Sequence, residues 1–200
     1  MILGVNEMEN KVVSVMIVGV GGQGTLLASR LLGAAMMQLG HDVKVSEVHG
    51  MSQRGGSVVT YVRYGKHVYS PIIDEGGADI ILAFEQLEAA RFLPYLKQGG
   101  TVIVNTQKID PMSVVTGAAQ YPDGLLEQIR TLGAEVLSMD ALSLAEEAGS
   151  VKAVNVVLIG AMAKKLGYGR DLWLDAIRAT VPQKFLALNE KAFALGYTHP

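Results

Sequence analysis

The chain has 200 residues, the size of one domain, and is too short for two well-formed cores with a linker. Hydrophobic residues make up 50% of it and charged residues 18%, which excludes intrinsic disorder. The net charge is −2 and the 17 basic residues form no run, so charge gives no reason to expect nucleic-acid binding. Cysteine is absent, which excludes disulfides, zinc–thiolate sites, cysteine nucleophiles and any iron–sulfur cluster held by thiolates of this chain.

The mean hydropathy of +0.29 is high, so either the core is large for this length or part of the apolar surface contacts another chain. Apolar segments such as Val15–Val20 and Ala78–Phe84 are far shorter than the roughly 20 residues that cross a bilayer. Residues 1–10 lack the features of a signal peptide, and we interpret them as an N-terminal tail before a single domain, residues 11–200. A cytoplasmic location is expected.

The first part of the chain alternates between strand and helix patterns. In chain order we expect a strand at Lys11–Gly19, a helix at Gly24–Leu39, a strand at Asp42–Glu47, a polar loop at Val48–Gly56, a strand at Ser57–Tyr64 and a short returning strand at His67–Ser70. The valine- and isoleucine-rich first strand is typical of a strand buried on both faces.

The same alternation continues to the C-terminus. In chain order we expect a strand at Ala78–Phe84, a helix at Glu85–Leu96, a strand at Thr101–Asn105 after a break at Gly99-Gly100, a helix at Gly124–Leu132, a strand at Glu135–Met139, and helices near Ala141–Ala148, Val154–Leu166, Asp171–Thr180 and after Pro182. The pattern predicts an α/β fold: a Rossmann-like, mixed but mainly parallel sheet with helices on both faces and a helical C-terminal segment.

A glycine-rich turn follows the first strand. Gly19-Val20-Gly21-Gly22-Gln23-Gly24 matches G-x-G-x-x-G and opens a helix, whose N-terminal N–H groups and partial positive charge suit a phosphate. Gln23 and Thr25 are placed to add hydrogen bonds, and Glu47 lies at the distance along the chain that ribose binding requires. Two other interpretations are equally open. The turn is tight only so that the helix packs closely on the strand, and Glu47 only caps nearby N–H groups.

The loop after the second strand is the more specific motif. It contains Gly50-Met51-Ser52-Gln53-Arg54-Gly55-Gly56 and lies at the carboxyl end of a strand, where open α/β sheets bind ligands. Arg54 is able to grip an anion with two hydrogen bonds, and its glycine neighbours allow N–H groups to turn toward the same anion. We expect this loop and the glycine turn to converge.

Together, the turn Gly19–Gly24 and the loop Ser46–Ser57 resemble the gamma-type small subunit of 2-oxoacid:ferredoxin oxidoreductases, and within that superfamily the beta subunits of the indolepyruvate branch. The likeness extends to Val68-Tyr69-Ser70-Pro71, Ala78-Asp79, Glu85, Glu88-Ala89, Arg91, Val104-Asn105-Thr106, Val154-Asn155, Val181-Pro182-Gln183-Lys184, Asn189 and Ala192-Phe193. It therefore runs from about Lys11 to Gly196.

The resemblance implies an enzyme that converts a 2-oxoacid (indolepyruvate or another arylpyruvate) and coenzyme A to an acyl-CoA and carbon dioxide, reducing ferredoxin. It places thiamine diphosphate and [4Fe–4S] clusters in a larger partner subunit, so this chain is expected to hold no metal, to supply no catalytic group and to be inactive alone. Its own expected ligand is coenzyme A. The candidate binding residues are Gly19, Gly21, Gly22, Gln23, Gly24, Thr25, Glu47, Gln53, Arg54, Gly55 and Gly56.

Two alternatives stay open: a self-contained NAD(P)- or FAD-binding domain that uses the glycine turn with Glu47, and a purely structural subunit without a ligand. Glu85 and Glu88 with Arg91 have the spacing of a surface salt bridge on a helix, which we favour over a catalytic carboxylate. The polar residues Asn105, Thr106 and Gln107, at the end of the predicted strand Thr101–Asn105, are interpreted equally well as capping residues or as part of a site.

Overall fold

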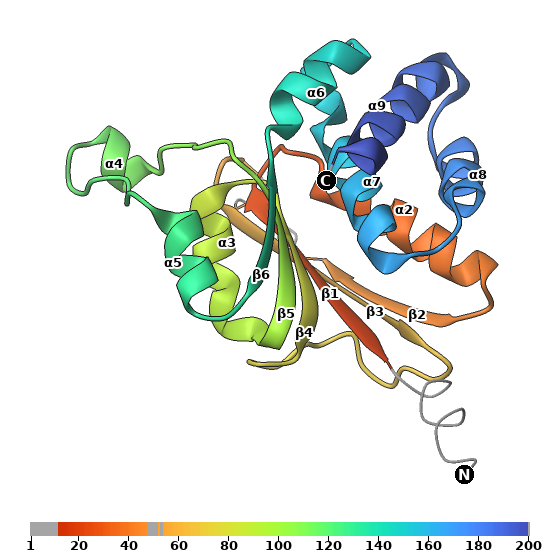
Figure 1. The fold of residues 1–200 in the computed structure, drawn as a ribbon, viewed down its shortest axis with the longest axis horizontal. Coiled ribbons are helices and arrows are strands. Elements are labelled where there is room, and N and C mark those ends of the chain that lie inside the picture. The colour runs from red at the N-terminus through yellow and green to blue at the C-terminus, as the bar shows by residue number, and fades with distance from the viewer. Residues whose placement is uncertain (1–11, 48–51, 53, 200) are drawn as a thin grey trace.

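The structure, a computed structural model, describes residues 12–47, 52 and 54–199, and these residues contain a six-stranded mixed sheet (Figure 1). The strands are β1 (Val13–Val20), β2 (Asp42–Glu47), β3 (Ser57–Gly65), β4 (Ala78–Ala83), β5 (Leu96–Asn105) and β6 (Glu135–Met139). Their order across the sheet is β2-β3-β1-β4-β5-β6. The expected tail, residues 1–10, and most of the loop Val48–Gly56, including Gln53, lie outside the described residues.

The sheet is mainly parallel, as the sequence predicts. β1 pairs with β4 in register Val15↔Ile80, and β4–β5 and β5–β6 are also parallel. β3 lies between β1 and β2 and is antiparallel to both. β2 therefore runs in the same direction as β1, and the carboxyl ends of β1, β2, β4, β5 and β6 meet at one edge, where β3 begins.

Helices cover both faces of the sheet (Figure 1). They are α2 (Thr25–Gln38), α3 (Gln86–Phe92), α4 (Met112–Val115), α5 (Leu125–Thr131), α6 (Ala141–Ala148), α7 (Val154–Leu166), α8 (Arg170–Thr180) and α9 (Leu186–Thr198), with short 3-10 turns η2 (Leu93–Tyr95), η3 (Val151–Ala153) and η4 (Gln183–Phe185). Because side chains alternate along a strand, Val15 and Ile17 of β1 pack under α2 and α6–α9, whereas Met16 and Val18 pack under α3 and α5.

Three predicted elements differ from the structure. The helix expected at Glu85–Leu96 is shorter, because α3 ends at Phe92, a 3-10 turn with Pro94 follows, and Leu96 already belongs to β5. His67–Ser70 forms no strand: the Val68 N–H donates to Asp42 Oδ2 at 2.9 Å, and Arg63 Nη1 donates to the carbonyls of Ser70 and Ile72, so side chains of the sheet bind this backbone. Gly99-Gly100 does not precede the strand either. β5 begins at Leu96 and contains both glycines in a register irregularity opposite Ala78–Ile80.

None of the helices in the described part of the chain has the length and apolarity needed to span a bilayer. The cytoplasmic location and the division into residues 1–10 and 11–200 stay predictions.

Candidate ligand site at the carboxyl edge of the sheet

The two motifs that the sequence singles out lie against each other at this edge. The N–H of Gly21, in the glycine turn (residues 19–24), donates to the carbonyl of Gly56 at 2.8 Å. The Gly56 N–H in turn donates to the carbonyl of Ser52 at 2.9 Å, which closes a tight turn around Arg54 and Gly55. The expected convergence of the two motifs is therefore confirmed, while ligand binding by either stays a prediction.

Packing requires glycine at both ends of the turn. A Cβ on Gly19 would lie 2.8 Å from Gln23 Oε1 and 3.0 Å from the Phe84 Cβ. Gly24 has φ +87°, and a Cβ there would lie 2.6 Å from Nδ2 of the buried Asn155, which donates to the Gly24 carbonyl at 3.2 Å. Close packing therefore explains the glycines at both ends of the turn without a ligand.

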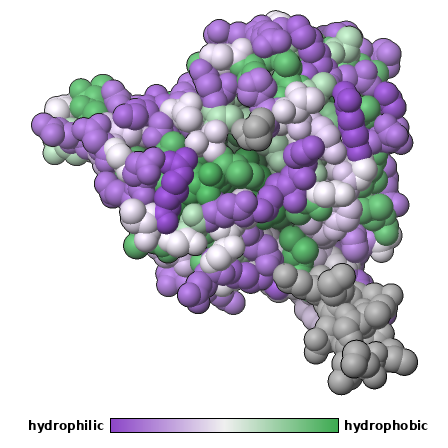
Figure 2. Space-filling model, viewed as in Figure 1, coloured by the Kyte–Doolittle hydropathy of each residue, from purple (hydrophilic) through white to green (hydrophobic). Residues whose placement is uncertain are grey.

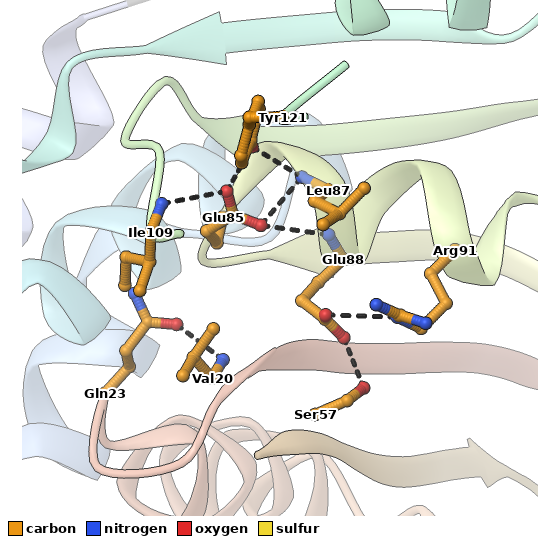
Figure 3. Close-up of polar contacts among 9 residues, drawn as sticks. All are labelled: Val20, Gln23, Ser57, Glu85, Leu87, Glu88, Arg91, Ile109 and Tyr121. Carbon is orange, nitrogen blue, oxygen red and sulfur yellow. Dashed lines mark hydrogen bonds and ion pairs between the residues drawn. The ribbon is translucent and has the colours of Figure 1, made fainter. Parts of the chain in front are cut away.

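The Gln23 side chain supports the turn from within the protein. Its Oε1 accepts a hydrogen bond from the Val20 N–H at 2.7 Å, as Figure 3 shows, and its Nε2 donates to the Phe84 carbonyl at 3.2 Å. The same Nε2 lies 3.5 Å from Oε1 of Gln107, beyond the end of β5. Ligand binding by Gln23 would require these bonds to be exchanged.

The N-terminus of α2 presents free backbone donors to the edge. Gly24 is the N-cap, no side chain caps the helix, and its first turn contains no acidic residue. The N–H groups of Gly22, Gly24, Thr25 and Leu26 find no acceptor within the part of the chain that the structure describes. These donors lie at the positive end of a 14-residue helix, and backbone N–H groups in this position are chemically suited to bind an anion.

The glycine turn separates two hollows. The larger has a volume of about 740 Å³, within the usual range for ligand pockets, and the smaller about 270 Å³. The larger is lined by Gly22, Gln23, Gly24, Gln107, Ile109, Leu142, Glu146, Val151, Lys152 and Val154. The exposed cation Lys152 and the apolar Val151 were not predicted as site residues, because nothing in their local sequence separates them from an ordinary helix start.

Arg54 and Gly55 are exposed at the open rim of the edge. Gly55 and Gly56 line a third hollow, of about 220 Å³, together with residues of α3 and of the segment after β5. Gly55 has φ +93°, a conformation that glycine adopts without strain and that turns the backbone sharply beside Arg54.

Glu88 anchors this loop, a role that the sequence does not reveal. The residue is only 4% exposed, and its carboxylate accepts hydrogen bonds from Ser57 Oγ and, at 3.1 Å, from Arg91 Nε (Figure 3). The predicted ion pair with Arg91 is present, but its interpretation as a surface salt bridge is wrong, because the carboxylate is buried. Ser57 follows Gly56 directly, so Glu88 fixes the end of the loop.

Glu85 is buried at the N-cap of α3 and gathers four donors. Its carboxylate accepts the N–H groups of Leu87 at 2.7 Å, Glu88 at 3.1 Å and Ile109 at 3.2 Å, and the hydroxyl of Tyr121 (Figure 3). Burial, reinforced by this carboxylate, raises the pKa of Tyr121 well above its ordinary value, so the phenol stays protonated and keeps donating.

Glu47 lies away from the glycine turn. Its Oε1 accepts a hydrogen bond from Ser29 of α2 at 3.0 Å, and it lines a separate hollow of about 550 Å³ between α2 and β2. In the dinucleotide-binding sheet the strand that carries the ribose-binding acid lies directly beside the first strand. Here β3 lies between them, which argues against the nucleotide role of Glu47.

Comparison with known proteins agrees with this geometry. The family model of pyruvate ferredoxin/flavodoxin oxidoreductase matches residues 14–199, and the indolepyruvate oxidoreductase subunit IorB of Pyrococcus horikoshii is 47% identical over 92% of this chain and 93% of its own. The chain belongs to the pyruvate ferredoxin/flavodoxin oxidoreductase family. It is the small subunit of a ferredoxin-dependent 2-oxoacid oxidoreductase, as the sequence predicts, and the self-contained nucleotide-binding alternative is not favoured.

Solved structures carry the same fold. The gamma subunit of a keto/oxoacid ferredoxin oxidoreductase from Geobacter sulfurreducens is 25% identical, with a TM-score of 0.69 over 92% of this chain and 96% of its own. A 2-oxoglutarate:ferredoxin oxidoreductase from Magnetococcus marinus is 20% identical, with a TM-score of 0.72 over 94% of this chain but only 31% of its own. In that protein the fold is therefore one part of a much longer chain.

Proposed function

We propose that this subunit binds the phosphate groups of coenzyme A at the carboxyl edge of its sheet, in an enzyme that oxidises indolepyruvate or another arylpyruvate. The observation that carries the proposal is the Gly21–Gly56 hydrogen bond, because it joins the uncapped N-terminus of α2 to the turn that bears Arg54. Backbone N–H groups and a guanidinium are the donors that phosphates accept most readily.

The hollow of about 740 Å³ has room for the remainder of such a ligand. Leu142, Val151 and Val154 provide apolar lining, and Lys152 provides a cation. A pocket with mostly apolar walls and a few polar groups suits a ligand with an uncharged arm and charged phosphates. Of the candidate residues, Gly21, Gly22, Gly24, Thr25, Arg54, Gly55 and Gly56 form the proposed phosphate site, with Gly19 and Gln23 as its support.

The cofactors of the reaction belong, in this proposal, to a larger partner subunit. Thiamine diphosphate supplies the carbanion chemistry and iron–sulfur clusters transfer the electrons to ferredoxin. This chain has no cysteine, and its described residues include no group of three or more His, Asp or Glu side chains placed to hold a metal ion. Its contribution is to bind and orient coenzyme A, and its contact with ferredoxin is indirect.

The arylpyruvate substrate is proposed from the 47% identity to the Pyrococcus horikoshii protein, whose name specifies indolepyruvate. The 2-oxoacid itself is expected to bind on the partner, so substitutions at this edge should leave its KM unchanged.

The test is Arg54→Ala in the complex co-expressed with the large subunit. Loss of a charge-assisted contact with phosphate should raise the KM for coenzyme A about tenfold, with little change in kcat or in the KM for the 2-oxoacid. Arg170→Ala, at an exposed arginine of α8, is the matched control. An unchanged KM for coenzyme A in Arg54→Ala would contradict the assignment.

A further inference from the structure

A groove of about 550 Å³ runs between α2 and β2, the strand at one edge of the sheet (Figure 1). We call it the α2–β2 groove. Its walls recur every three or four residues on the helix and every second residue on the strand, so one face of each element forms each wall. The lining residues are Ser29, Arg30, Gly33 and Met37 of α2, and Val43, Val45 and Glu47 of β2. None of these seven lines the hollows at the glycine turn or beside Gly55 and Gly56, so the groove is separate from the proposed coenzyme A site.

One end of the groove carries opposite charges on its two walls. The residue Ser29 is only 1% exposed, and its hydroxyl donates to Glu47 Oε1 at 3.0 Å, which holds the carboxylate against α2. Arg30, exposed beside Ser29 on the helix, makes no ion pair within the described part of the chain. Because a carboxylate accepts several hydrogen bonds at once, a donor of a ligand is able to join Ser29 at Glu47.

The rest of the groove is apolar. Met37, 60% exposed, and Val45, 41% exposed, line it together with Val43. Gly33 leaves the middle open, since a Cβ there would meet only Val43 Cγ1, at 3.8 Å, an ordinary contact. A helix rises about 1.5 Å per residue, so the wall from Ser29 to Met37 is about 12 Å long. This length suits a small molecule with a charged head and an apolar side chain.

We propose that the α2–β2 groove binds an α-amino acid with a large apolar side chain. The ammonium group of this ligand faces Glu47, and its carboxylate faces Arg30. Its side chain lies along the apolar part of the groove. The charges select this class of ligand, because a cation and an anion on opposite walls match a zwitterion, whereas an acid or an amine alone leaves one of the two charges unmatched.

The test is the binding of L-phenylalanine to the complete small subunit, measured by isothermal titration calorimetry. A Kd on the order of 0.1 mM is expected for a ligand of this size. Phenethylamine lacks the carboxylate and 3-phenylpropionate lacks the ammonium group, so each should bind about tenfold more weakly through the loss of one charge-assisted hydrogen bond. Glycine, which lacks the apolar side chain, should show no saturable binding.

Two variants place the ligand in this groove. Arg30→Gln should raise the Kd for L-phenylalanine about tenfold and leave the Kd for phenethylamine unchanged, since phenethylamine has no carboxylate. Arg170→Gln, at an exposed arginine of α8, is the matched control and should bind like the wild type. Gly33→Leu fills the groove and should abolish binding, while its thermal unfolding should not fall below that of the wild type, because leucine favours a helix more than glycine does.

Three results would overturn the inference: no saturable binding of L-phenylalanine, equal affinities for the three phenyl ligands, or the same Kd for L-phenylalanine in Arg30→Gln and Arg170→Gln. The first two would exclude a site for a zwitterion, and the third would place the ligand elsewhere. Failure of the coenzyme A assignment is a separate outcome, since it is measured by the KM of Arg54→Ala, and Arg54 does not line this groove.

Discussion

The glycine turn and the segment of residues 106–124, which we call the α4 arm, lie at the same edge of the sheet, and a polar side chain contributes to the shape of each. Gln23 binds the backbone of the turn from within, and Glu85 binds both limbs of the arm. They present different chemistry, since the turn offers backbone N–H groups and the arm offers apolar side chains (Figure 2). The difference teaches that one edge of the sheet carries backbone donors and exposed apolar side chains on different supports, so substitutions in the turn and in the arm test the two supports separately.

The largest expected effect concerns the turn. Gly24→Ala should lower the free energy of unfolding by about 2–4 kcal/mol, because φ +87° disfavours a side chain and the new Cβ would collide with Asn155. Gly40→Ala is the matched control: its φ is +79°, but a Cβ there meets no atom within 4 Å, so about 1 kcal/mol is expected. Chemical denaturation measures both, and equal losses would show that the contact with Asn155 contributes nothing.

An intermediate effect is expected where the support of the Arg54 loop is removed. Glu88→Ala should lower the free energy of unfolding by about 2–3 kcal/mol, because Ser57 loses its buried acceptor. The pair Glu127–Arg130 has the same i,i+3 spacing but is exposed, and Glu127→Ala should change stability by about 0.5 kcal/mol or less. The KM for coenzyme A should rise in Glu88→Ala alone. If Glu88→Ala and Glu127→Ala changed the free energy of unfolding and the KM for coenzyme A to the same extent, Glu88 would not support the loop.

The smallest effect concerns the base of the arm and depends on pH. Because the pKa of Tyr121 is raised in the folded chain, the unfolded chain releases this proton first, near its ordinary value of about 10. The stabilising contribution is thus complete below about pH 10 and is lost as the pH rises toward the folded pKa. Tyr121→Phe should lose less stability than the wild type over that range, and amide exchange in its arm should be faster. Tyr69→Phe, at an exposed ring, is the control and should lose stability at alkaline pH as the wild type does. If the stability of Tyr121→Phe and Tyr69→Phe fell equally with rising pH, the bond between Tyr121 and Glu85 would contribute nothing.

Most of the fold follows from local patterns in the sequence. β2, β6, α6 and α7 match their predicted ranges, because each combines a clear apolar pattern with flanking glycine or polar residues. Two features have no local signal. The α4 arm is too short and too irregular to show a helical period. The position of β3 between β1 and β2 is a pairing between distant segments, which local spacing does not determine.

The site was only partly predictable for the same reason. Glycines after a strand and an arginine between glycines are visible in the sequence, and their convergence follows from the rule that strand ends share an edge. The role of Glu88 depends on Ser57, 31 residues earlier, so its spacing to Arg91 looks like that of the exposed pair Glu127–Arg130. The inward orientation of Gln23 likewise depends on Phe84, 61 residues later and just beyond the end of β4.

The antiparallel β3 limits what this scaffold can become. Because β3 lies between β1 and β2, Glu47 is two strand spacings, or about 9–10 Å, from β1. Its carboxylate also already accepts a hydrogen bond from Ser29. Converting the edge to recognise a nicotinamide nucleotide would therefore require rerouting the chain, since exchanging side chains leaves the acid one strand too far away.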